Sequence, residues 1–96
     1  MRIQPNSFPF TASRHVASSV HDNGIVLLHI RNGFFFASNA TGARIWRGVE
    51  ERQSLETIVQ DLSSDYQIDP TMARGHVEGF LIELERQGLV QREMPS

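Results

Sequence analysis

Residues 25–41 read Ile-Val-Leu-Leu-His-Ile-Arg-Asn-Gly-Phe-Phe-Phe-Ala-Ser-Asn-Ala-Thr, and the expected fold follows from this stretch. The Asn32-Gly33 pair between two apolar runs predicts a β-hairpin, because a type I′ turn needs positive φ at both central residues. A two-residue turn would place Ile30 opposite Phe35. Asn39 then favours the start of a helix, as a good N-cap residue. The second strand is therefore expected to be the last of its sheet, with one edge open.

The chain on either side of this hairpin extends the same pattern. Residues 15–21 have strand character, and three helices are expected after the hairpin: one over residues 40–49, one after Ser54, and one from Asp69-Pro70 to Gly88. This order predicts an α+β fold, a three-stranded antiparallel sheet followed by three helices, with a winged helix-turn-helix-like arrangement. Residues 1–13 are expected to form an irregular arm, 14–90 the domain, and 91–96 a frayed tail.

The middle strand is apolar on both of its faces, so its own sequence does not decide which face points toward the helices. Residues on a strand alternate between the two faces of the sheet. We predict that Phe34 and Phe36 lie on the face away from the helices, beside His29. The residues predicted to face the helices are Val26, Leu28, Ile30, Phe35 and Ala37.

Composition describes one small domain. The 96 residues are 40% hydrophobic and 21% charged, with no cysteine, so neither disulfides nor thiolate metal sites are expected. No apolar run approaches the roughly 20 residues of a membrane span, and the first residues lack a signal-peptide pattern. The sequence thus predicts a cytoplasmic protein with no membrane partner.

Motifs for catalysis and metal binding are missing from the sequence. It has no G-x-S-x-G stretch, no cysteine nucleophile and no glycine-rich phosphate loop. The histidines at positions 15, 21, 29 and 76 do not have the spacing of metal ligands. We therefore predict a protein that is not an enzyme and that uses no cofactor and no metal.

Two kinds of partner remain, nucleic acid and peptide. The third helix carries Arg74 and Arg86 among four acidic residues, and the net charge is -2, so this helix would repel phosphate. No nucleic-acid partner is therefore expected. Three consecutive aromatics, residues 34–36, lie beside an open edge, which suits β-augmentation by an extended peptide. Peptide docking is the favoured hypothesis, and winged-helix DNA binding is the competing one.

Residues 14–90 resemble the PqqD-like family of recognition domains from ribosomal peptide modification pathways. The most specific part of the resemblance is residues 39–46, Asn-Ala-Thr-Gly-Ala-Arg-Ile-Trp. It also rests on residues 24–28, on the aromatic pair before Asn39, on a second helix ending at Tyr66, and on the series Val77, Phe80, Leu81, Leu84, Gly88, Leu89 and Val90.

The resemblance implies a domain that binds the leader segment of a precursor peptide. In this family the leader adds a strand to the third strand of the sheet and lies in a groove against the third helix. Carried over to this chain, the docking edge is Phe34, Phe35, Phe36 and Ala37. The facing helix wall would come from Arg74, Val77, Glu78, Leu81 and Glu85.

Two departures and one choice of subfamily accompany the resemblance. Ser38 stands where the family often has leucine, which should loosen the packing there. His76 stands where the family often has aspartate, which would change the leader charges that are favoured and make binding pH-sensitive. The chain looks most like the stand-alone leader-binding proteins of lasso peptide pathways, which implies a leader peptidase as the partner enzyme. The alternative is an adaptor for a radical-SAM enzyme, as in pyrroloquinoline quinone biosynthesis. A monomer or a weak dimer is expected, because an open edge can pair with itself.

Overall fold

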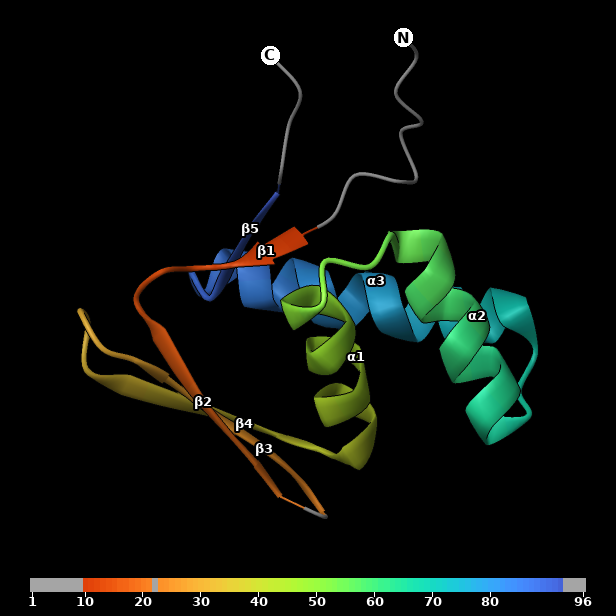
Figure 1. The fold of residues 1–96 in the computed structure, drawn as a ribbon, viewed down its shortest axis with the longest axis horizontal. Helices are drawn as coiled ribbons and strands as arrows, with labels where there is room; N and C mark the ends of the chain where they lie inside the picture. Colours follow the sequence, from red (N-terminus) through yellow and green to blue (C-terminus); the bar gives the residue numbers. More distant parts are fainter. Residues whose placement is uncertain (1–9, 22, 93–96) are drawn as a thin grey trace, which may run out of the picture.

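The computed structural model describes residues 10–21 and 23–92, and in this part the fold is α+β as predicted. An antiparallel sheet is formed by β2 (Val16–His21), β3 (Gly24–His29) and β4 (Phe34–Asn39), in that order. Three helices follow: α1 (Ala40–Glu50), α2 (Leu55–Tyr66) and α3 (Pro70–Arg86). Figure 1 shows the sheet on one side of the molecule and the helices on the other.

The helix starts follow from local side-chain chemistry. Asn39 Oδ1 accepts a hydrogen bond from the Gly42 N–H at 3.0 Å, and Ser54 Oγ accepts one from the Thr57 N–H at 3.1 Å. Asp69 caps α3, where Pro70 occupies the first turn. Each cap satisfies a backbone donor that the helix itself leaves unpaired. All three predicted N-caps are confirmed.

The hairpin between β3 and β4 differs from the predicted two-residue turn. His29 pairs with Phe34, so residues 30–33 form a four-residue loop, and only Gly33 in it has positive φ, at +71°. The Gly33 N–H donates to the His29 carbonyl at 2.7 Å, and the Asn32 N–H donates to His29 Nδ1 at 3.2 Å. The buried His29 side chain therefore helps to close the loop. The Asn-Gly pair by itself did not indicate this contact.

The predicted orientation of the sheet is wrong. Ile25, Leu27 and His29 are buried against the helices, whereas Phe35 is 70% exposed and Ile30 is 60% exposed on the surface. Phe34 and Phe36 are half-buried and pack against the core. Their cross-strand partners, His29 and Leu27, are buried. Because β3 is apolar on both faces, alternation in the sequence could not identify the buried set; the position of the helices does so.

A second, two-stranded sheet joins segments from near the two ends of the chain. β1 (Phe10–Ala12) pairs antiparallel with β5 (Val90–Arg92), and Leu89 and Val90 are buried in the core. The predicted irregular arm and frayed tail are therefore wrong for residues 10–12 and 91–92. The remaining residues of both segments, 1–9 and 93–96, lie outside the described residues.

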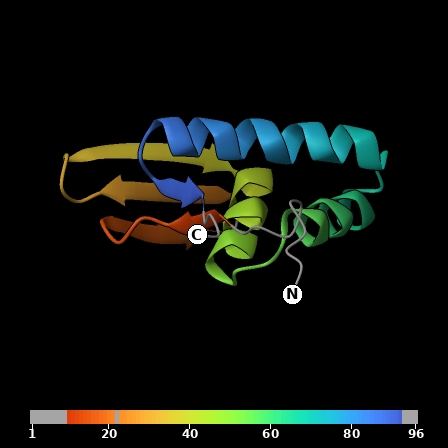
Figure 2. The same ribbon diagram turned by 90° about the horizontal axis from the view of Figure 1, so that it is seen from above.

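One hydrophobic core connects these elements. It lies between the inner face of β3, the three helices and the segment leading into β5. Figure 2 shows α3 on the same side of the molecule as β4, with β2 on the far side of the sheet. The core residues are Ile25, Leu27, Ala43, Ile45, Trp46, Val49, Ile58, Val59, Leu62, Ala73, Val77, Leu81, Leu84, Leu89 and Val90.

Candidate functional site

The outer edge of β4 is the first element of the candidate site. Within residues 10–21 and 23–92, β4 pairs only with β3. The Ile30 N–H donates to the His15 carbonyl at 2.7 Å, so the even-numbered residues of β3 form their hydrogen bonds with β2. The alternate residues of β3, which are 25, 27 and 29, therefore form theirs with β4. Their partners are residues 34, 36 and 38. The backbone N–H and C=O groups of Phe35 and Ala37 therefore point outward, as an unused hydrogen-bonding row.

The side chains of β4 divide between two surfaces. Phe35 and Ala37 are exposed on the face of the sheet that no helix covers. Phe34 stacks on His29, with ring centroids 5.2 Å apart, and Phe36 lies 6.2 Å from the ring of Phe80 on α3. The predicted docking edge thus combines an outward backbone at Phe35 and Ala37 with the aromatic side chain of Phe36, which reaches α3.

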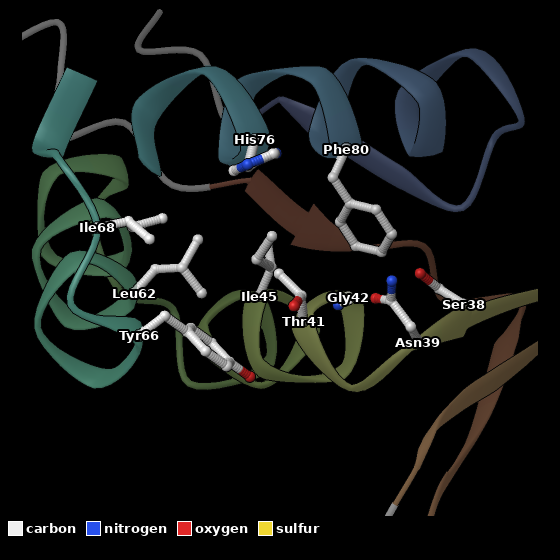
Figure 3. A pocket seen from close by; sticks show the side chains of 10 residues that line it. All are labelled: Ser38, Asn39, Thr41, Gly42, Ile45, Leu62, Tyr66, Ile68, His76 and Phe80. Atoms are coloured by element: carbon white, nitrogen blue, oxygen red, sulfur yellow. Dashed lines mark hydrogen bonds between the residues drawn. The ribbon is translucent and has the colours of Figure 1, made fainter. Parts of the chain in front are cut away.

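A pocket of about 420 Å³ lies where β4 runs into α1 (Figure 3). This volume is in the range of pockets that hold a small ligand or a few side chains. Three aliphatic side chains line it, and α3 contributes His76 and Phe80 beside them. The lining residues are Ser38, Asn39, Thr41, Gly42, Ile45, Leu62, Tyr66, Ile68, His76 and Phe80.

Gly42 allows the pocket wall to close tightly. A Cβ atom placed on Gly42 would lie 2.2 Å from Ser38 Oγ and 3.0 Å from the Phe80 ring. The distance to Ser38 is shorter than Cβ contacts allow and the distance to Phe80 is tighter than usual, so a larger residue at this position in α1 would force both side chains to shift. Ser38 was expected to loosen the packing, but its side chain fits directly against this glycine.

The predicted wall of α3 is placed differently from the expectation. Val77 and Leu81 are 0% and 1% exposed, so their side chains belong to the core. Arg74 pairs with Glu56 on α2 and with Glu78, while Glu85 pairs with Arg92 on β5 at 3.1 Å. The structure therefore does not bring these charges to the β4 edge. His76 and Phe80 occupy the side of α3 toward β4 instead.

The charged side chains on the side of α3 that faces α2 form ion pairs with one another and with α2. The hydrogen bond from Arg74 to Glu56 raises the pKa of the Arg74 guanidinium, and the charge of Glu56 adds to this rise. A similar pair, Arg44 with Asp65 at 2.8 Å, raises the pKa of Arg44. These pairs link α1 with α2 and α2 with α3 at the surface, and none of their residues lines the pocket next to β4.

Sequence reasoning missed the pocket because its residues come from distant parts of the chain. Residues 39–46, Tyr66 and Phe80 are parts of the family resemblance, and Ser38 and His76 are departures from it, but no local pattern indicates that they line one pocket. Within the described residues there is no group of three or more side chains suited to holding a metal ion. A search of the same residues found no helix both long and apolar enough to cross a membrane.

Comparison with known proteins gives the site a context. The family model of coenzyme PQQ synthesis protein D (PqqD) matches residues 24–90, more than half of the chain. The structure of TbiB1 in complex with the TbiA(beta) leader peptide is similar, with a TM-score of 0.79 and 32% identity over 83% of this chain and 93% of that one. A lasso peptide synthetase B1 complexed with the leader peptide gives a TM-score of 0.77 and 26% identity over 90% and 98%.

Comparison with curated protein sequences found no match. The family model nevertheless spans β3, β4, the three helices and the segment leading into β5, and the structural similarity to TbiB1 covers 83% of the chain. The motif in residues 39–46 on which the resemblance rested forms the N-cap and first turns of α1, beside the pocket. This chain belongs to the PqqD family.

Proposed function

We propose that this protein is a non-catalytic adaptor that binds the leader segment of a ribosomally synthesised precursor peptide. The leader adds as a strand to the outer edge of β4 and extends along the side of α3 toward the pocket. The observation that carries the proposal is the outward backbone of Phe35 and Ala37, which leads directly to a pocket with an apolar floor. Backbone hydrogen bonds supply affinity in this mode, and pockets for alternate side chains supply specificity.

The similar structures support a peptide partner. Both are described as complexes with a leader peptide, and this chain covers nearly the full length of each protein. The residues of this chain proposed to meet the peptide are Phe34, Phe35, Phe36 and Ala37 on β4, with His76 and Phe80 on α3. Arg74, Glu78 and Glu85, which belonged to the predicted wall, are not included because they face α2 and β5.

The enzyme that receives the bound precursor is proposed from the same comparisons. A leader peptidase of a lasso peptide pathway is favoured, since both similar structures come from leader-binding proteins and one is named a lasso peptide synthetase B1. A radical-SAM enzyme is the second candidate, and the description of the family model favours it. Each candidate predicts that the adaptor, its leader peptide and that enzyme form a complex together.

The first test is fluorescence anisotropy with a labelled leader peptide from the precursor encoded beside this gene. A random DNA duplex of the same length serves as the control. We expect submicromolar peptide binding with a shallow salt dependence, and no binding of the duplex. Binding of the duplex without the peptide would refute the adaptor and support the competing winged-helix function.

A further inference from the structure

The pocket at the end of β4 has an unusual distribution of charge. Its ten lining residues include only two titratable side chains, His76 and Tyr66, and no Asp, Glu, Lys or Arg. Figure 3 shows His76 and Phe80 on the α3 side of the pocket and Tyr66 on the opposite side. The remaining polar groups are the Ser38 and Thr41 hydroxyls and the Asn39 amide.

The carboxylates on neighbouring elements already have partners. On α2, Asp65 accepts a hydrogen bond from Arg44 at 2.8 Å, and at the start of α3, Asp69 accepts one from the Thr71 N–H at 2.7 Å. Further along α3, Glu83 accepts one from the Gln87 side chain at 2.8 Å. The residues that β4 and α1 contribute to the pocket carry no charge. A protonated His76 therefore meets no protein anion among the residues that line this pocket.

We propose that this pocket accepts a glutamate side chain of the bound peptide and that His76 selects it by donating a hydrogen bond to the carboxylate. The apolar floor of Ile45, Leu62 and Ile68 suits the two methylene groups of glutamate. The imidazole and the hydroxyls of Ser38 and Thr41 suit its oxygens, and a hydrogen bond between two charged groups is stronger than a neutral one. This inference rests on the proposed function, because it assigns one specificity position of the same peptide site.

Histidine changes its charge between about pH 5 and pH 8, so the selection depends on pH. An imidazolium donates a charge-assisted hydrogen bond to a carboxylate, whereas a neutral imidazole offers a single uncharged donor. Binding of a glutamate-bearing peptide is expected to weaken as the pH rises. A glutamine in its place removes the charge on the peptide, and binding then becomes nearly independent of pH.

The probe is a display library of random 20-residue peptides, selected on the wild-type protein at pH 5.5. The best binder and its Glu→Gln analogue are then measured at pH 5.5 and 8.0 against the wild type, His76→Gln and His21→Gln. His21 is the matched control, because it is an exposed histidine on β2 whose Nε2 lies 2.9 Å from Ser19 Oγ, outside the pocket.

The wild type and His21→Gln should bind the glutamate peptide about tenfold more tightly at pH 5.5 than at pH 8.0. His76→Gln should lose this difference, and the glutamine analogue should change less than twofold. No enrichment of acidic residues, or the same pH dependence in His76→Gln, would overturn the inference.

A separate measurement distinguishes failure of this inference from failure of the proposed function. If the selected peptides bind through the β4 edge, they should lose affinity for an Ala37→Pro variant, whatever residue enters the pocket. Binding that Ala37→Pro removes, without any preference for glutamate, leaves the adaptor standing and refutes the role of His76. A library that yields no binder in the selection at pH 5.5 refutes both.

Discussion

Among the residues that the structure describes, the central sheet has two unpaired edges, β4 and β2, and they differ in what lies beside them. Each edge borders a hollow of similar size, about 420 Å³ next to β4 and about 490 Å³ next to β2. The hollow at β4 has an apolar floor and no Asp, Glu, Lys or Arg in its lining. The hollow at β2 has Arg44, Arg47 and Glu50 in its lining, beside Val20, Ala40, Ala43 and Tyr66. Ser18 Oγ on β2 donates to Glu50 at 3.1 Å.

The comparison indicates that an unpaired backbone row is not enough to make a peptide site. Hydrogen-bonded pairs alternate along the β2–β3 ladder as they do along β3–β4, so the backbone N–H and C=O groups of Ser18 and Val20 point outward from β2. Both edges could therefore pair with a strand. Only β4 continues into a hollow with no Asp, Glu, Lys or Arg in its lining, so an apolar peptide side chain can enter it without desolvating one of these charges.

The largest expected effect is on the β4 edge itself. Ala37→Pro removes an outward N–H without removing a hydrogen bond between β4 and β3, because proline has no amide hydrogen. We expect leader-peptide affinity to fall by about 100-fold in anisotropy titrations. The matched control is Val20→Pro, the same change on β2, which should keep the wild-type affinity within about threefold.

Circular dichroism of both variants has to show the wild-type spectrum for this comparison to be valid. A folded Ala37→Pro variant that binds normally would refute strand addition at β4. Loss of binding in Val20→Pro alone would move the site to the other edge of the sheet.

The next effect concerns the pocket wall. Phe80 contacts the ring of Phe36 and lines the pocket, so Phe80→Ala should weaken peptide binding about tenfold by isothermal titration calorimetry. The control is Ile82→Ala, a residue of the same helix that is 52% exposed and lies toward Phe10 and Arg92. Equal losses in both variants would indicate a general disturbance of α3 rather than a contact with the peptide.

A smaller effect is expected on the uncovered face of the sheet. The Phe35 side chain is 70% exposed and points away from α3, although its backbone lies on the binding edge. Phe35→Ser should change peptide affinity by less than about threefold, because the outward N–H and C=O groups are kept. A tenfold loss, measured by anisotropy, would show that the peptide also contacts this face.

The smallest effect is expected for the charges first assigned to the peptide site. Arg74 pairs with Glu56 and Glu78 on the side of α3 that faces α2, and exposed ion pairs contribute little. Arg74→Gln should leave the peptide dissociation constant unchanged within about twofold at 50 and 300 mM salt. A clear loss at low salt alone would mean that Arg74 steers the peptide by long-range attraction.

Local chemistry in the sequence was sufficient for the helices. Asn39, Ser54 and Asp69 each cap a helix as expected, because a side chain and a backbone N–H two or three residues away decide the contact. The end of α3 is also decided locally, because Gly88 adopts the left-handed conformation (φ +78°) that commonly follows a helix. The order of strands and helices, and hence the fold class, follows from these signals together with the apolar stripes.

The sequence by itself thus determined the three strands of the central sheet, the three helices, their order and the identity of the open strand. Only the tertiary structure decided which face of β3 is buried, since both faces are apolar, and that β1 and β5 pair across nearly the whole chain. It also decided which side of α3 meets β4, placing His76 and Phe80 there and Arg74 and Glu85 elsewhere. Contacts between distant segments depend on how whole elements pack, and a local pattern carries no information about that packing.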